Sequence, residues 1–157
     1  MKAFNNEPEF KEQLLRLALE HEALDHYIAG TYNQENDGGE FRGCSVGCTI
    51  NDVNRLKGLD GCHDDHAFLA VVLGVPLFIV NAQESIFEGS PHHLRIPWTY
   101  RFLKAIPVGA DLTPVKTSFP RELDRLFRSS LPPETLETAE GAEARADLLI
   151  KLIKECS

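Results

Sequence analysis

Apolar side chains recur at helical spacing from the beginning of the chain. The apolar positions of the first such segment are Phe10, Leu14, Leu17, Leu24 and Ile28. Their intervals of three, four and seven residues place them on one face of an α-helix. Asn6 can cap this helix, and Pro8 fits its first turn. The pattern therefore predicts a helix of about 20 residues that ends near Gly30.

The same spacing predicts helices along most of the remaining chain. Asp64 or Asp65 can begin a helix that Gly74 and Pro76 close, and Pro97 interrupts a later segment. The further predicted helices cover 44–57, 65–73, 76–88, 98–105, 119–131 and a C-terminal stretch through Ala146, Leu149, Leu152 and Ile153. In the segment after Pro76 the expected core positions are Leu77, Val80, Ile86 and Phe87. Because period-two alternation is weak, we expect an all-α fold, an irregular bundle of about six to seven helices.

The length of the chain favours a single domain. With 157 residues it can bury a core without a metal or disulfides, so we expect one helical domain over residues 1–157. Residues 31–43 are polar and contain glycines, which indicates a mobile loop. Residues 131–143 begin with low hydrophobicity and acidic charge. They form either a linker before the C-terminal helix or the first part of that helix.

The charge of the chain narrows the classes of partner. A formal net charge of -8 and an isoelectric point near 5.2 repel phosphate backbones and anionic lipid surfaces, so we expect neither nucleic acid nor a membrane as partner. The longest uncharged run, 67–80, is shorter than a membrane span, and the N-terminal residues lack the features of a secretion signal. The sequence thus predicts a cytoplasmic protein. Its amphipathic helices are compatible with a homodimer, whereas no motif identifies a small-molecule ligand.

Cysteine and histidine gather in one short segment. Cys44, Cys48, Cys62 and His66 form the pattern C-x3-C followed by C-x3-H, which is similar to the paired ligand spacing of structural zinc sites. On one helix, Cys44 and Cys48 would direct both sulfurs to the same face. Since cytoplasmic thiols stay reduced, metal ligation or redox sensing is favoured over structural disulfides. These four residues are the candidate zinc ligands, and His63 is a spare nitrogen donor.

Three alternatives compete with the metal hypothesis. Cysteine is among the most buried residue types, so the GCSVGC sequence at 43–48 is also typical of a stripe of small residues where helices pack closely. A thiol redox sensor would use Cys44, activated at a helix start, with Cys48 as its resolving partner. An interaction or regulatory module without catalysis fits a sequence that contains no recognisable catalytic set, and we assign no catalytic residue.

A second polar group contains His21, Glu22, Asp25 and His26. Spacings of three and four residues could bring a carboxylate and an imidazole together on a helix. Di-iron bundles use two Glu-x-x-His helices, and this chain has neither that spacing here nor a second copy. We therefore expect a salt-bridged surface at these positions.

Several short sequences resemble those of a group of small bacterial proteins that share a GCxVGCT motif and have no known activity. They are GCSVGCT at 43–49, LGVP at 73–76, IFEG at 86–89 and AIPVGADL at 105–112. That group often carries a histidine closely after its cysteine motif, where this chain has TINDVN at 49–54, and it has no counterpart of Cys62. The resemblance therefore implies another ligand set, built from Cys44, Cys48, His66 and either Glu84 or Glu88.

Overall fold

The computed structural model describes residues 1–35, 38–129, 134–135 and 138–156. Helices dominate these ranges, which confirms the all-α prediction. They include the 3-10 helix η1 (Ala3–Asn6) and the α-helices α1 (Pro8–Ala23), α2 (Ser45–Lys57), α3 (His66–Leu73), α4 (Leu77–Gly89), α5 (His92–Arg95), α6 (Trp98–Ala105), α7 (Val115–Ser129) and α8 (Ala139–Lys154). Two short strands, β1 (Gln34–Glu35) and β2 (Phe41–Arg42), pair antiparallel.

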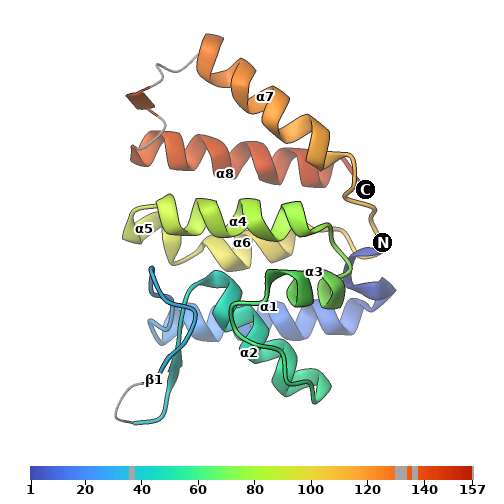
Figure 1. Ribbon diagram of the computed structural model, residues 1–157, viewed down its shortest axis with the longest axis vertical. Helices are drawn as coiled ribbons and strands as arrows, with labels where there is room; N and C mark the ends of the chain where they lie inside the picture. The colour runs from blue at the N-terminus through green and yellow to red at the C-terminus, as the bar shows by residue number, and fades with distance from the viewer. Residues whose placement is uncertain (36–37, 130–133, 136–137, 157) are drawn as a thin grey trace.

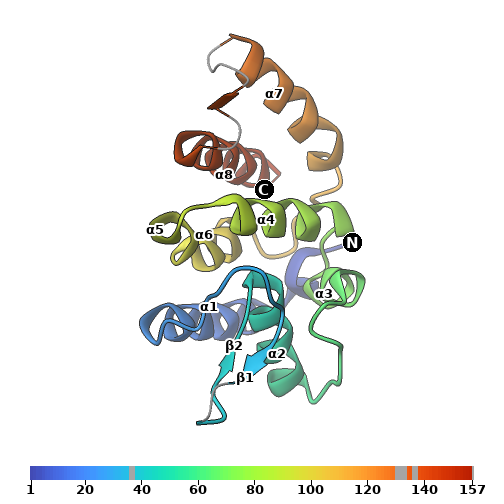
Figure 2. The same ribbon diagram turned by 60° about the vertical axis from the view of Figure 1, so that its left-hand side comes forward.

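The helices stack in layers along the long axis of the molecule (Figure 1). α7 and α8 pack together at one end, α4 and α6 lie below α8, and α1, α2 and α3 form the other end. Figure 2 shows the same order from another side, with the β1–β2 hairpin beside α2. The side chains between the layers form one buried cluster, and Trp98 is the largest of the fully buried ones.

Buried hydrogen bonds fix α2 against α4 and α6. The Ser45 hydroxyl donates to Gln83 Oε1 at 2.7 Å, and the Thr99 hydroxyl donates to Ser45 Oγ at 2.9 Å. The Trp98 indole N–H donates to the Gln83 carbonyl oxygen at 2.9 Å. Because buried polar groups need partners, these bonds define where the first turn of α2 lies relative to α4.

The first helix ends earlier than its apolar pattern predicts. α1 stops at Ala23, and Asp25 adopts a left-handed backbone conformation with φ of 54°. The His26 N–H donates to the His21 carbonyl oxygen at 2.9 Å and closes the helix end. The prediction that the helix continues to near Gly30 was wrong. A helical period cannot separate the apolar residues of a helix from those of a turn and an extended segment that follow it.

Capping residues limit α3 as predicted. The Asp65 carboxylate accepts a hydrogen bond from the Phe68 N–H at 2.8 Å, and Gly74 ends the helix at φ of 67°. The predicted helix over 76–88 also agrees closely with α4. Of its predicted core positions, Val80, Ile86 and Phe87 are buried. Leu77 is 44% exposed, so its predicted burial was wrong, because it lies on the outer face of the first turn of α4.

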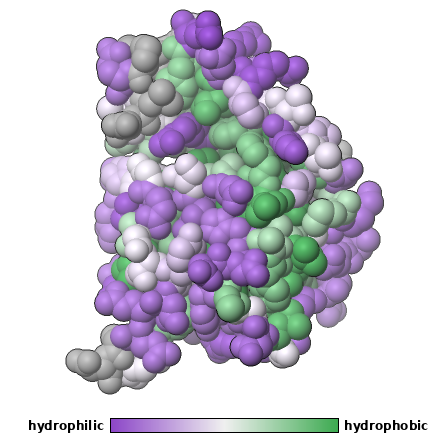
Figure 3. Space-filling model, viewed as in Figure 1, coloured by the Kyte–Doolittle hydropathy of each residue, from purple (hydrophilic) through white to green (hydrophobic). Residues whose placement is uncertain are grey.

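Apolar surface gathers over α3 and the neighbouring start of α4, as Figure 3 shows. Val71 of α3 is 67% exposed, and Leu77 of α4 is 44% exposed. No single helix within the described ranges has both the length and the apolar character needed to span a membrane. The segments 66–73 and 77–89 reach that length and composition only as a pair, and they are bent by 117° where they meet.

Two segments expected to be irregular contain regular structure. Within 31–43, β1 and β2 form a hairpin, and residues 36 and 37 lie outside the described ranges. Within 131–143, the residues from Ala139 onward belong to α8, whereas 131–133 and 136–137 lie outside the described ranges. The mobility of the first segment and the linker role of the second stay predictions.

Candidate metal centre

The glycines of the GCSVGC sequence allow a loop to reach the first turn of α2. The Cys44 N–H donates to the Thr31 carbonyl oxygen at 2.8 Å. A Cβ atom on either Gly43 or Gly47 would overlap the Tyr32 carbonyl oxygen. The small residues therefore permit close packing, but their partner is the backbone of residues 31 and 32 rather than a second helix.

Cys44 is the N-cap residue of α2. Its backbone is extended, with φ of -69° and ψ of 178°, and its Sγ accepts a hydrogen bond from the Gly47 N–H at 3.4 Å. The cysteine forms no disulfide and is 1% exposed. Its sulfur is thus buried at the positive end of the α2 dipole.

Two glutamates of α4 approach this sulfur. Glu84 and Glu88 are one helical turn apart, so both project from the same face of α4. The Glu84 carboxylate accepts hydrogen bonds from the Val46 N–H, at 3.1 Å, and from the Cys44 thiol. The Glu88 oxygens accept from the Gly30 N–H at 2.9 and 3.1 Å. Cys44 Sγ and one carboxylate oxygen of each glutamate lie within 4.8 Å of one another.

Burial and like charge favour the protonated forms of Cys44 and Glu84. Desolvation raises the pKa of the Cys44 thiol, and the negative charge of Glu84 raises it further. Desolvation also raises the pKa of Glu84, although its hydrogen bonds with Cys44 and Val46 oppose the shift. Glu84 is 6% exposed, whereas Glu88 lies at the surface. A divalent cation would remove the repulsion by replacing protons at the buried groups.

His66 and Tyr32 lie beside the cluster. Asn81 Oδ1 is 2.7 Å from His66 Nδ1, and because an amide oxygen only accepts, Nδ1 donates. His66 Nε2 then accepts from the Tyr32 hydroxyl at 3.2 Å. The positive form of His66 lowers the pKa of Glu84 by its charge, so the two residues are within electrostatic range. An imidazole oriented through its Nδ1–H in this way is typical of metal ligands.

The four cysteine and histidine residues singled out by spacing do not converge. Cys44 belongs to the cluster, and His66 lies next to it. Cys48 Sγ donates instead to the Gly43 carbonyl oxygen at 3.4 Å, and Cys62 is exposed in the segment before α3. The two motif sulfurs do not share a helix face, because Cys44 precedes the helical part of α2. Within the described ranges, the only group of three or more converging ligand atoms is Cys44, Glu84 and Glu88.

Near the end of α1 the expected salt-bridged surface is present at Asp25, which lies 3.7 Å from Arg42, but not at His21. His21 is 6% exposed, and its Nε2 lies 2.9 Å from Oδ1 of the buried Asp52. His26 follows the turn and contacts His21. The surface expectation was wrong for His21, because its partner comes from α2, at a sequence distance that helical spacing does not reveal.

Comparisons of the chain with protein-family models, with curated proteins and with solved structures gave no match. The site is therefore assigned from its own geometry. Sequence reasoning named Cys44, His66, Glu84 and Glu88 but missed Tyr32 and Asn81. A signal for Asn81 existed, since residues 81, 84 and 88 share one face of a predicted helix. The sequence contains no such signal for Tyr32, because the position of this residue depends on a loop.

Proposed function

We propose that the protein binds a divalent transition-metal ion, most favourably zinc, through Cys44, Glu84 and Glu88. The observation that carries this proposal is the approach of one sulfur and two carboxylate oxygens to within 4.8 Å of one another. Thiolate ligation favours zinc over magnesium or calcium, which prefer sites made of oxygen atoms alone. The three ligands come from two helices that buried hydrogen bonds hold together, so the site needs little reorganisation.

The charges of the cluster fit a cation. A thiolate and two carboxylates carry three negative charges, and a doubly charged ion offsets most of them. Three protein ligands leave the fourth tetrahedral position of zinc for water or a substrate. His66 is the residue expected to occupy that position in a closed, structural site, since Asn81 already orients its ring.

We expect purified wild-type protein to contain close to one equivalent of zinc and Cys44→Ser to bind it at least about 100-fold more weakly, because loss of even an outer-shell partner costs about 10–100-fold. Serine is a good N-cap and can accept the Gly47 hydrogen bond, so the helix start should survive the change. Elemental analysis, followed by titration against a chromophoric chelator, measures both quantities.

Cys62→Ser is the matched control, because it changes an exposed cysteine outside the cluster. Cys48→Ser tests the ligand set inferred from spacing, and we expect its zinc content to equal that of the wild type. Zinc loss in Cys48→Ser without loss in Cys44→Ser would reject the assignment. Zinc-free wild-type protein that also fails to take up added zinc would reject the function.

The affinity for zinc should rise with pH. The pKa values of Cys44 and Glu84 are raised, so zinc must displace the thiol proton at neutral pH, and each displaced proton adds about tenfold affinity per pH unit. In the metal-free protein, the stability of the fold should change with pH in the opposite direction. Groups with raised pKa values stabilise the fold below their ordinary pKa, and this contribution is lost as pH rises through the folded value. Calorimetry in buffers of different ionisation enthalpy counts the released protons, and a pH-independent affinity would contradict the prediction.

A thiol sensor has less support than a metal site. Desolvation raises the pKa values of both Cys44 and Cys48, which lowers the thiolate fraction that oxidants attack. Both sulfurs are also buried, with exposures of 1% and 0%.

A further inference from the structure

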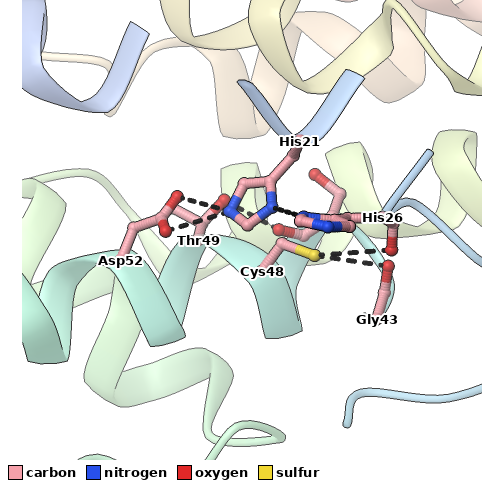
Figure 4. A network of polar contacts seen from close by, with 7 residues as sticks. His21, His26, Gly43, Cys48, Thr49 and Asp52 are labelled. Atoms are coloured by element: carbon pink, nitrogen blue, oxygen red, sulfur yellow. Dashed lines mark hydrogen bonds and ion pairs between the residues drawn. The ribbon is translucent and has the colours of Figure 1, made fainter. Parts of the chain in front are cut away.

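A second polar network lies between the end of α1 and α2, and it does not include the candidate metal ligands (Figure 4). His21 Nε2 contacts both carboxylate oxygens of Asp52, at 2.9 and 3.0 Å. His21 Nδ1 lies 2.9 Å from His26 Nδ1. Asp25, which lies between the two histidines in the sequence, has a left-handed backbone conformation in the turn after α1. The side-chain contacts thus run without a break from Asp52 through His21 to His26.

The two histidine rings, while in contact, leave one nitrogen for an added proton. The ionised Asp52 carboxylate only accepts hydrogen bonds, so His21 Nε2 carries a hydrogen. The two Nδ1 atoms share a single hydrogen, because a second hydrogen between them would find no lone pair. An added proton can therefore bind only at His26 Nε2. This atom is buried and has no hydrogen-bond partner among the described residues.

Protonation of His26 is unfavourable while its ring stays against His21. The new N–H at Nε2 would be a charged, buried donor without an acceptor, so its lost hydration would not be replaced. Water can solvate the same ring once it has moved out of the contact. Desolvation accordingly lowers the pKa of His26 in the fold, and the charge of His21 lowers it further. Acid therefore favours an arrangement in which the His26 ring has left His21.

Charged groups of both signs surround His26. They are Glu20 and His21 of α1, Cys48, Asp52 and Arg55 of α2, Glu40 and Arg42 at β2, and Asp25 of the turn. The charges of Glu40 and Glu20 favour the protonated ring, whereas the charge of Arg42 opposes it. Burial has a larger influence on the pKa of His26 than any of these charges. The buried position of the ring therefore sets the direction of its response to acid.

The backbone of His26 connects the turn after α1 to the start of α2. The His26 N–H donates to the His21 carbonyl oxygen at 2.9 Å, and the Gly43 N–H donates to the His26 carbonyl oxygen at 3.0 Å. The Ile28 N–H donates to the Gly43 carbonyl oxygen at 2.9 Å. Gly43 directly precedes Cys44, the N-cap residue of α2. A movement of His26 therefore acts on the pairing between the turn and the segment that leads into α2.

We propose that residues 24–28 form an acid-sensitive latch, in which a proton taken up at His26 detaches its ring from His21 and loosens the turn from Gly43. The proton comes from solvent, and its release restores the contact. A detached histidine has the ordinary pKa of about 6.5, whereas the attached ring resists protonation. The latch is therefore closed above about pH 6.5, and its closed-to-open ratio falls by up to about tenfold for each pH unit below that value.

Amide hydrogen exchange followed by NMR, with a chelator present throughout, tests the latch. The amides of Ile28 and Gly43 report its opening, and circular dichroism reports the helix content of the whole chain. We expect the protection factors of these two amides, corrected for intrinsic exchange, to fall by up to about tenfold per pH unit below about pH 6.5. The helix content should stay constant over the same range. Because the chelator keeps the protein metal-free at every pH, the result is independent of the proposed metal binding.

His26→Asn separates the latch from other effects of acid, because its amide N–H can still donate to His21 Nδ1 but takes up no proton. We expect the fall in protection to disappear in this variant. His93→Asn changes an exposed histidine of α5 and is the matched control, which should keep the wild-type response. Constant protection in the wild type would overturn the proposal. An equal fall in His26→Asn and the wild type would also overturn it, because the proton would then act at another group.

Nitrogen-15 NMR of the histidine rings tests the same proposal in the wild-type protein alone. At about pH 7.5 the hydrogen of neutral His26 should lie on Nδ1, and Nε2 should gain a proton only as the protection of Ile28 and Gly43 falls. A His26 ring that becomes doubly protonated while both amides keep their protection would overturn the latch.

Discussion

Gly47→Ala should destabilise the protein by about 2 kcal/mol or more, although alanine is the better helix former. The added Cβ would overlap the Tyr32 carbonyl oxygen, which is backbone and cannot rotate away. The loop must therefore move off α2, and the hydrogen bond from Cys44 N–H to Thr31 is lost with it. A gain of about 1 kcal/mol from helix propensity offsets only part of this cost. Urea denaturation followed by circular dichroism measures the free energy of unfolding.

Gly89→Ala is the matched control within another helix. Its Cβ would lie 3.0 Å from Nη2 of Arg145, the far end of a flexible side chain that can shift. We expect the stability of this variant to be unchanged or raised by up to about 1 kcal/mol. A Gly47→Ala variant as stable as Gly89→Ala would contradict the close approach of the loop. The displaced loop also carries the Gly30 N–H that holds Glu88, so zinc affinity should fall in Gly47→Ala alone.

Asp52→Ala should have the largest effect on stability, a loss of about 3 kcal/mol. The change leaves the His21 Nε2–H without its acceptor in a site where His21 is 6% and Asp52 is 3% exposed. An unsatisfied buried donor costs its full desolvation, and the vanished side chain leaves a cavity. The same denaturation experiment at neutral pH gives the magnitude.

Asp147→Ala is the matched control, because it removes the same charge as Asp52→Ala. Asp147 pairs with Arg101 at 2.9 Å, but its side chain is 63% exposed. Exposed ion pairs contribute about 0–1 kcal/mol to stability, so Asp147→Ala should lower the free energy of unfolding by at most about 1 kcal/mol. Equal losses in the two variants would mean that the contact between His21 and Asp52 contributes no more than a surface ion pair.

Local signals were sufficient for most of the helices. Asp65 and Gly74 set the two ends of α3. The predicted C-terminal apolar positions lie on α8, and all four are buried: Ala146, Leu149, Leu152 and Ile153. The errors have a shared physical cause. The end of α1 depends on a left-handed residue at Asp25, and the exposure of Leu77 depends on which face of α4 meets the core. Neither property is encoded by spacing within one segment.

The candidate metal centre was only partly accessible to sequence reasoning. Cysteine spacing drew attention to Cys44 but paired it with Cys48, because the argument assumed that both residues are helical. The structure gives Cys44 an extended N-cap backbone, so its sulfur turns toward α4 instead. Glu84 and Glu88 entered only through the resemblance to a group of small proteins, and only Glu88 lies in one of the shared sequences, IFEG at 86–89. Ligands that are 40 residues or more apart must be brought together by tertiary packing, which a linear pattern does not record.

The hydrogen bonds between Gly30 and Glu88, and between Val46 and Glu84, close long segments of chain. Closing such loops lowers the entropy of the chain, so we expect these pairings to form after the helices that they connect. A chain still emerging from the ribosome would expose Cys44 well before its glutamates are synthesised. Under the proposed metal binding, an incomplete site would hold the ion only weakly, and metal uptake would follow the assembly of the helical layers.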